Sequence, residues 1–215
     1  NEGDQVLVES VNETSVYTYD TFVLGEGGGT NSGKFTGSIP ADAVTLNVYF
    51  PTTVTNEDFK LNTQKQTDVA SLAHLANYDV MFASNIDASG NEISFSLEHK
   101  GMIFTLPITN STGEVQKIIG ITLANEKSAD LGSVFAKSVQ VSDGAFAMTA
   151  TPSFTLGIEN GTVEADAEYK AYMLVCMEDL TALNGQNLDV IVHTEKGRHT
   201  ITKTAVEFTA GTRYT

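Results

Sequence analysis

Two histidines near a turn are the residues whose type and spacing first suggest chemistry. His193 and His199 flank the turn at Glu195–Arg198, so they could face each other across a hairpin. Two imidazoles on neighbouring strands can hold a metal ion. A third ligand would have to be Glu195, turned inward. Exposed hairpin histidines explain the same pattern, and we expect no metal site.

Two acidic pairs in turns are candidates for hydrolytic chemistry. They are Glu164 with Asp166 and Glu178 with Asp179. Paired carboxylates can cleave glycosidic bonds, and their separation sets the stereochemistry. Nothing in the sequence brings the two pairs together, and the chain has no tryptophan to stack on a sugar. G-x-S-x-G, H-E-x-x-H and the calcium loop D-x-D-x-D-G are all missing. We therefore predict that the protein is not an enzyme and has no catalytic residues, no metal and no cofactor.

The glycine run Gly25–Gly33 (GEGGGTNSG) could in principle cradle a phosphate. It lacks the Lys-Ser/Thr pair and the following helix that a phosphate-binding loop needs. The run therefore predicts a flexible hairpin loop.

Cys176 is the single cysteine, so no disulfide can form within the chain. It lies in Ala171–Met177 (AYMLVCM), which is apolar on both faces of a strand. We expect a buried and unreactive thiol rather than a nucleophile.

The composition limits the class of partner. The 215 residues suffice for one large or two small β domains, and the formal net charge is −15. Nucleic acids and anionic membranes favour basic surfaces, so neither is expected as a partner. The sequence contains no leader-like or membrane-spanning apolar run, which fits a cytoplasmic chain or the mature part of an exported one.

The longest strand-like run is Ile93–Ile108 (ISFSLEHKGMIFTLPI). Apolar residues alternate from Ile93 to Leu97 and again from Met102, but in the opposite phase. The slip falls at His99–Gly101, where glycine permits a bulge. His99 is interpreted as a packing or hydrogen-bonding residue of this bend. The residues before and after the slip are expected to pack in different environments.

The rest of the chain reads as many short strands separated by turns. The clearest strands are Val6–Val11, Val16–Leu24, Val44–Phe50, Val115–Leu123 and Tyr169–Met177. The segment Thr52–Gln66 is polar and predicts a loop, whereas Asp68–Leu75 is the one helix candidate, with Asp68 as its cap. This pattern predicts an all-β protein of two β-sandwich domains, residues 1–90 and 91–215, with little helix.

Four segments, in order, resemble the fimbrillin-like (Mfa-like) family of type V pilins and related surface proteins. They are Phe35–Pro51, with an F-x-G motif and an apolar strand ending in Tyr49-Phe50-Pro51; Leu75–Ser84, with Asp79, Met81 and Ala83 in a D-x-M-x-A motif; Phe95 and His99 in an F-x-x-x-H motif; and the closing Val206–Thr215. Together they span most of the chain.

The resemblance implies two tandem transthyretin-like, Greek-key β-sandwich domains, export, and display at the outer-membrane surface. It implies a fimbrial (pilus) subunit or accessory whose partners are other fimbrial subunits, joined by β-strand addition after loss of the first strand. The strands Val6–Val11 and Val16–Leu24, tethered by the glycine run, are the exchangeable candidates.

The sequence also departs from this family. It has no N-terminal cysteine for a lipid, it ends at Thr215 where the family usually continues with another strand, and its arginines, Arg198 and Arg213, lie far from any N-terminal cleavage site. The sequence therefore leaves open whether the protein is a tip subunit, an anchor or a solitary adhesin. It also leaves open whether a host glycan or a host protein is its receptor. The alternative function is a carbohydrate-binding β-sandwich surface protein, in which Tyr17, Tyr19 and Tyr49 would supply the stacking surfaces.

Overall fold

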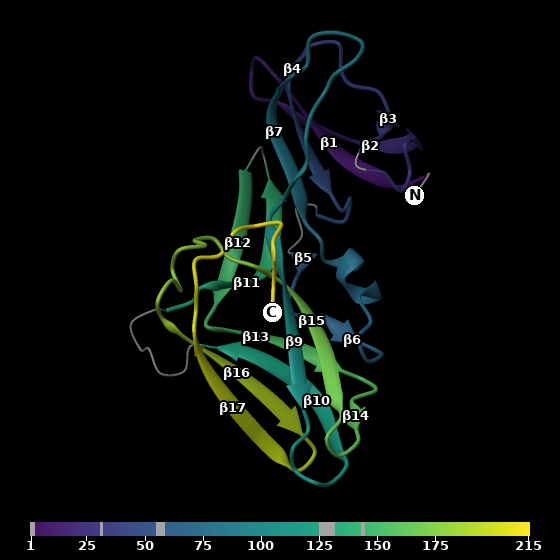
Figure 1. Ribbon diagram of the computed structural model, residues 1–215. Coiled ribbons are helices and arrows are strands. Elements are labelled where there is room, and N and C mark those ends of the chain that lie inside the picture. The colour runs from purple at the N-terminus through teal and green to yellow at the C-terminus, as the bar shows by residue number, and fades with distance from the viewer. Residues whose placement is uncertain (1–2, 31, 55–58, 125–131, 143–144) are drawn as a thin grey trace. The chain divides into compact units, whose positions relative to one another are not determined.

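The computed structural model describes residues 3–30, 32–54, 59–124, 132–142 and 145–215. Almost every regular element in these ranges is a strand, and the one helix described is a 3-10 turn at Ala73–Asn77, so the all-β prediction is confirmed (Figure 1). No helix in the described ranges is long and apolar enough to cross a membrane.

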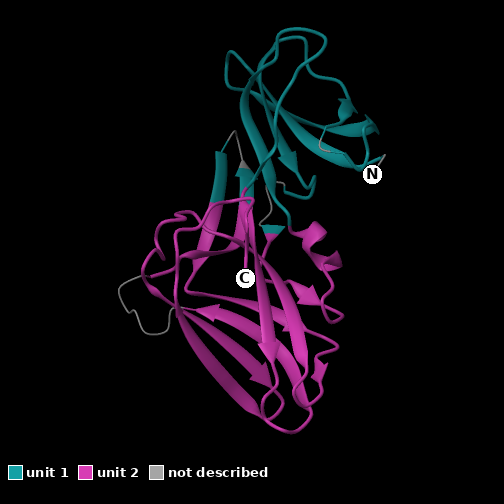
Figure 2. Cartoon of the chain, in the orientation of Figure 1, with its two compact units in different colours: residues 1–59, 79–99, 140–147 teal, residues 60–78, 100–139, 148–215 magenta. Residues whose placement is uncertain are grey.

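The chain forms two compact units, shown in different colours in Figure 2. Unit 1 is Asn1–Phe59, Asp79–His99 and Gln140–Ala147, and unit 2 is the remainder. The sequence instead predicts a single boundary at residue 90. The difference arises because pairing between distant segments, and not chain order, decides which residues pack together. One crossing, between His99 and Lys100, coincides with the phase change noted in the sequence.

Unit 1 contains an antiparallel sheet of six strands in the order β3-β2-β1-β4-β7-β8. Its strands are β1 (Gln5–Asn12), β2 (Tyr17–Glu26), β3 (Lys34–Thr36), β4 (Ala43–Phe50), β7 (Met81–Asp87) and β8 (Glu98–His99). The turn between β1 and β2 is held by the Asn12 side chain, whose Oδ1 accepts the backbone N–H groups of Thr14 and Val16, each at 3.0 Å.

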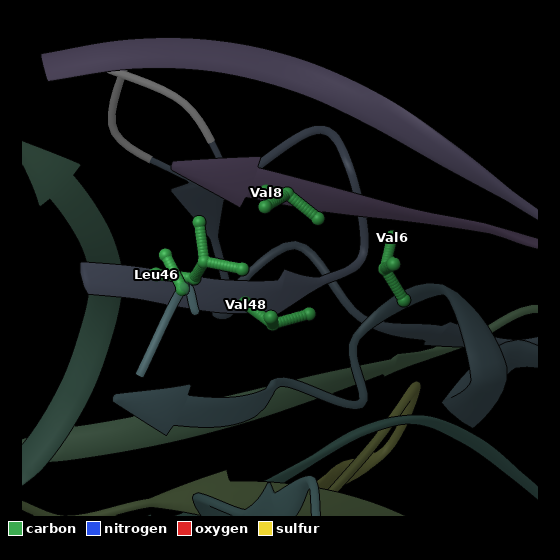
Figure 3. Packing of buried hydrophobic residues seen from close by; sticks show 5 residues of the cluster. Val6, Val8, Leu46 and Val48 are labelled. Carbon is green, nitrogen blue, oxygen red and sulfur yellow. The ribbon is translucent and has the colours of Figure 1, made fainter. Parts of the chain in front are cut away.

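The core of unit 1 lies on one face of β1 and β4. Val6 and Val8 of β1 and Leu46 and Val48 of β4 are spaced two residues apart, so their side chains share this face (Figure 3). All four are at most 3% exposed. Partly buried residues pack against them, among them Phe22, Phe35, Ile93, Phe95 and Leu97.

The expectation of one continuous strand from Ile93 to Ile108 is wrong in its first half. Residues 93–97 pair with no strand, and only β8 and β9 (Gly101–Thr109) are ladders, with Lys100 between them. The alternation of Ile93, Phe95 and Leu97 comes from packing of their side chains on the unit 1 core. An alternating pattern indicates that one side of an extended segment is buried. Residues 93–97 meet this condition although their backbone pairs with no other strand.

The other face of the unit 1 sheet is also covered. Tyr49 of β4 stacks on Phe82 of β7 with ring centroids 4.8 Å apart, and Phe82 stacks on Phe146 at 5.7 Å. Phe146 lies on β12 (Ala145–Thr151), which with β11 (Phe135–Ser142) and β5 (Phe59–Lys60) forms a three-stranded sheet. This aromatic stack explains why residues 140–147 belong to unit 1. The sequence Ser142-Asp143-Gly144 predicts a hairpin turn, and Asp143 and Gly144 lie outside the described residues.

Unit 2 is built from two layers, visible in the lower part of Figure 1. The larger sheet has the order β17-β16-β10-β13-β6, with β14 paired to β10, and the smaller has the order β15-β9-β18. The remaining strands are β6 (Lys65–Gln66), β10 (Gln116–Ala124), β13 (Ser153–Ile158), β14 (Thr162–Val163), β15 (Glu168–Cys176), β16 (Asn187–Thr194), β17 (Gly197–Thr204) and β18 (Arg213–Tyr214). Fully buried side chains from both layers form its core, including Ile121, Leu123, Phe154, Leu156, Tyr169 and Met173.

The segment 64–66, which the sequence predicts to be loop, joins the two layers of unit 2. Its backbone extends the larger sheet through β6, which runs parallel to β13. The N–H of Gly157 donates to the carbonyl of Gln64, and that of Glu159 donates to the carbonyl of Gln66, both at 3.0 Å.

The two glutamine side chains complete the free edge of β15 in the smaller sheet. The Gln64 amide donates to the Leu174 carbonyl at 2.6 Å and accepts the Leu174 N–H at 2.9 Å. Gln66 accepts the Tyr172 N–H at 2.9 Å and donates to the Lys170 carbonyl at 3.0 Å. Both side chains are buried, at 2% and 0% exposure. A carboxamide carries the same donor and acceptor as a peptide group, so each one takes the place of a residue on a neighbouring strand.

The predicted helix Asp68–Leu75 is also wrong, because its backbone donates a hydrogen bond to the same edge of β15. Ala70 adopts φ +57 and donates its N–H to the Lys170 carbonyl at 3.1 Å, which is incompatible with a helix there. The 3-10 helix follows later, at Ala73–Asn77, with no side-chain cap. From it, His74 Nε2 lies 3.0 Å from the Tyr172 carbonyl, and burial lowers the pKa of His74.

The sequence also predicts a strand at Val206–Thr209. This prediction is wrong, because residues 206–209 form no strand, and β18 instead runs parallel to β9. The side chain of Arg213 donates from Nε to Thr105 Oγ1 at 2.7 Å and lies 5.0 Å from the centroid of the Tyr172 ring.

We predict that Gln64→Leu strongly destabilises the protein. Leucine fills similar volume but leaves the Leu174 N–H and carbonyl without partners, at about 1–3 kcal/mol for each buried group. Urea unfolding followed by circular dichroism measures the change. Gln186→Leu, at an exposed glutamine, is the matched control and should shift stability by less than about 0.5 kcal/mol. Equal effects of the two substitutions would contradict the role assigned to Gln64.

Candidate functional site

The two hairpin histidines do not face each other. Directly paired residues point to the same face of a sheet and successive residues alternate. His193 pairs with Arg198 and His199 pairs with Val192, so the imidazoles lie on opposite faces. Glu195 instead accepts a hydrogen bond from Lys117 Nζ at 2.6 Å. In the part of the chain that the structure describes, no group of three or more His, Cys, Asp or Glu residues is placed to hold a metal.

Both acidic pairs belong to turns. Asp179 Oδ1 accepts the hydroxyl and the N–H of Thr181 at 2.7 and 2.8 Å, and these bonds hold the pKa of Asp179 below its usual range. Asp166 adopts φ +59 and donates its N–H to the Asn110 carbonyl at 2.7 Å, while the Glu164 carbonyl accepts from the Asn110 amide at 3.0 Å. No hydrogen bond or ion pair joins the two pairs within the described ranges.

The thiol of Cys176 is buried, as predicted. It is 0% exposed on β15, whose residues from Ala171 onward are buried on both faces. A thiol in this position is shielded from reagents and substrates.

Two residues of the sequence motifs meet in unit 1. His99 Nδ1 lies 2.8 Å from Asp79 Oδ1, with the histidine side chain 48% and the aspartate side chain 27% exposed. No hydroxyl or thiol is bonded to either side chain in the described structure, so the pair lacks the nucleophile of a catalytic triad. Asp79 and His99 are the first and last residues of one segment of unit 1. The pair therefore links the two ends of the unit 1 segment Asp79–His99.

The best-formed candidate for an interaction site is the place that β1 occupies. β1 lies between β2 and β4 and pairs with both along most of its length. Residues 6–10 are all buried, and two of them belong to the core cluster. β1 is therefore part of the core of unit 1, and its loss would leave a gap between β2 and β4.

The face of β1 opposite its two core valines carries a buried carboxylate. Glu9 on β1 is 0% exposed, and its Oε2 accepts the Asn47 amide at 2.7 Å and the Tyr49 hydroxyl at 3.0 Å. Burial, and then the charge of Glu9, raise the pKa of Tyr49 far above its ordinary value. These polar contacts fix the pairing of β1 with β4 in one register, because a slip would leave the carboxylate unpaired.

The three tyrosines considered for sugar stacking do not form an exposed platform. Tyr49 is 1% exposed and its ring is covered by Phe82. Tyr17 and Tyr19 on β2 are half-buried. A stacking surface built on all three is therefore excluded.

We expect the native protein to protect Cys176 from thiol reagents. Labelling with a chromogenic disulfide should be slow in buffer and complete in denaturant, because the thiol is accessible only after unfolding. Fast labelling of the native chain would contradict its burial.

The raised pKa of Tyr49 predicts loss of stability in alkali. In the unfolded chain a tyrosine ionises near its ordinary pKa of 10.0, whereas the folded state keeps Tyr49 protonated to higher pH. The folded state therefore holds more protons above about pH 10, and stability falls there by up to about 1.4 kcal/mol per pH unit. Tyr169, whose pKa burial raises to about 12, adds to the same slope. Unfolding from pH 9 to 11 should show a shallower slope for Tyr49→Phe than for the native chain or for Tyr214→Phe.

Comparison with known proteins supports the fold. No protein-family model matches the chain, and no curated protein does. A crystal structure described as a "putative cell adhesion protein" from Bacteroides uniformis matches with a TM-score of 0.53 and 14% identity, over 99% of this chain and 84% of that chain. At this identity the likeness shows the fold, and this chain therefore shares its all-β architecture with that protein.

Proposed function

We propose that the chain is a non-enzymatic cell-surface adhesion protein, a fimbrial subunit or accessory that assembles by β-strand addition. It would be exported and held at the outer membrane or within a fimbria. The observation that carries the proposal is the position of β1, a terminal strand inserted between β2 and β4 with two valines in the core. The adhesion role of the similar Bacteroides protein and the order of the four sequence motifs support it.

The structure suggests which edge would receive a partner strand. β1, β2 and β3 follow one another in the first 36 residues and form one side of the unit 1 sheet. Loss of this N-terminal segment would expose β4 along Ala43–Phe50. A donor strand could then pair with the β4 backbone and place two apolar side chains where Val6 and Val8 now lie.

The energetics favour exchange over simple loss. Burying a valine side chain stabilises a fold by about 1.5–3 kcal/mol, so an empty groove would expose a substantial part of the unit 1 core. A trimmed chain would therefore have to bind a donor or associate with another copy. The donor should carry small aliphatic residues two positions apart, matched to the spacing of Val6 and Val8.

The test is limited proteolysis in the glycine run, followed by size-exclusion chromatography with light scattering. We expect cleavage before Phe35, an intact unit 2, a monomeric native chain, and a trimmed chain that oligomerises or binds a labelled peptide of the β1 sequence QVLVESVN. A peptide with both core valines replaced by aspartate is the control and should not bind. If the trimmed chain stays monomeric and binds neither peptide, assembly by strand addition is wrong and a solitary adhesin becomes the better reading.

A further inference from the structure

The larger sheet of unit 2 has an outer face with a different character from its core face. Ile121 and Leu123 of β10 point to the core and are 0% exposed. Thr122, between them, points to the outer face. There it lies beside Thr155 of β13 on one side and Ile191 of β16 on the other.

The next row of this outer face carries His193 and Arg198. His193 pairs with Arg198 of β17 on one side and with Gly120 of β10 on the other. Gly120 in turn pairs with Gly157 of β13. Neither glycine places a side chain beside the imidazole, and Gly120 is itself buried.

These rows line an open hollow of about 240 Å³. Its lining includes Thr122, Ser153, Ile191, His193 and Arg198. Thr122 Oγ1 lies 2.8 Å from Thr155 Oγ1 and 2.9 Å from His193 Nε2, so the imidazole is held in place by a hydroxyl pair. The hollow is smaller than the pockets of about 300–1,000 Å³ that hold drug-sized ligands. It therefore fits a single small ring.

Arg198 gives the hollow a positive charge on a protein whose net charge is −15. A guanidinium has five N–H donors, so a contact within the protein still leaves donors for a ligand. The carboxylate of Asp189 on the same face is 1% exposed, accepts the Thr202 hydroxyl and does not line the hollow. A planar guanidinium matches a carboxylate through two parallel hydrogen bonds. A phosphate monoester carries about −1.5 to −2 charges, which one arginine does not neutralise.

We propose that this hollow binds one acidic sugar unit through its carboxylate. Arg198 receives the carboxylate, while His193 and the hydroxyls of Thr122 and Ser153 exchange hydrogen bonds with the sugar hydroxyls. Pro152, an exposed residue of the lining, offers an apolar surface to ring C–H groups. This binding would use the intact chain and does not depend on strand addition.

The test is titration of the intact chain by isothermal calorimetry and saturation-transfer NMR. The probes are methyl glucuronide and sialyllactose, each with its neutral counterpart, methyl glucoside or lactose, and with acetate as a simple carboxylate. We expect saturable binding of at least one acidic sugar, and binding at least about tenfold weaker for its neutral counterpart and for acetate, because each loses part of the contact set.

Three variants assign the contact. Arg198→Ala should weaken binding of the acidic sugar about tenfold or more, and Arg198→Lys should recover only part of it because lysine cannot bind in a bidentate manner. Lys203→Ala removes the same charge from the same strand but on its other face, and should leave binding unchanged. The inference is overturned if no acidic sugar binds, if Arg198→Ala binds like the native chain, or if neutral sugar or acetate binds equally well. None of these results would alter the outcome of the strand-addition experiment.

Discussion

The closing of the β15 edge by two glutamine side chains is the constraint on which unit 2 depends. A sheet edge at the side of a sandwich presents N–H and carbonyl groups that must be paired when water is excluded. In this protein the partner is a short segment that gives its backbone to the larger sheet and its carboxamides to the smaller one. The same few residues therefore hold the two layers together. They also explain why residues 60–78 belong to unit 2 while their neighbours on both sides belong to unit 1.

The edges of the sheets differ in how their backbone groups are covered, and this difference bears on assembly. The edge of β15 is filled by side chains and offers nothing to an incoming strand. β17, by contrast, is exposed along its whole length and carries basic residues, which discourage uncontrolled pairing between copies of the same chain. In unit 1 the position between β2 and β4 is filled by the chain's own β1.

The sequence predicted what depends on local periodicity. The strands β1, β4 and β10 and the burial of Cys176 follow from apolar alternation or from a run that is apolar on both faces, and the structure confirms them. The alternation at residues 93–97 led to the wrong prediction of a strand, because packing of side chains on a core produces the same sequence pattern as pairing in a ladder. The sequence left open whether the two hairpin histidines face each other, because the spacing of two residues around a turn does not fix which face each one takes.

The glutamines and the hollow could not have been predicted from local patterns. Gln64 meets Leu174 across 110 positions of sequence, and in isolation both glutamines look like the polar residues of a loop. The grouping of Thr122, His193 and Arg198 depends on the register of three strands from distant parts of the chain. Asp79 was singled out by resemblance and His99 also by its place at the bend, and only the structure shows that they contact each other.

The membership of residues 140–147 in unit 1 has a consequence for the order of folding. Phe146 stacks on Phe82, which stacks on Tyr49, so one covering layer of unit 1 comes from residues made long after its sheet. During synthesis or passage through a membrane the N-terminal strands would remain incompletely covered until the β11–β12 hairpin had emerged. Folds that depend on such distant pairings form slowly. A chain of this design therefore leaves its N-terminal strands incompletely covered until late in its synthesis.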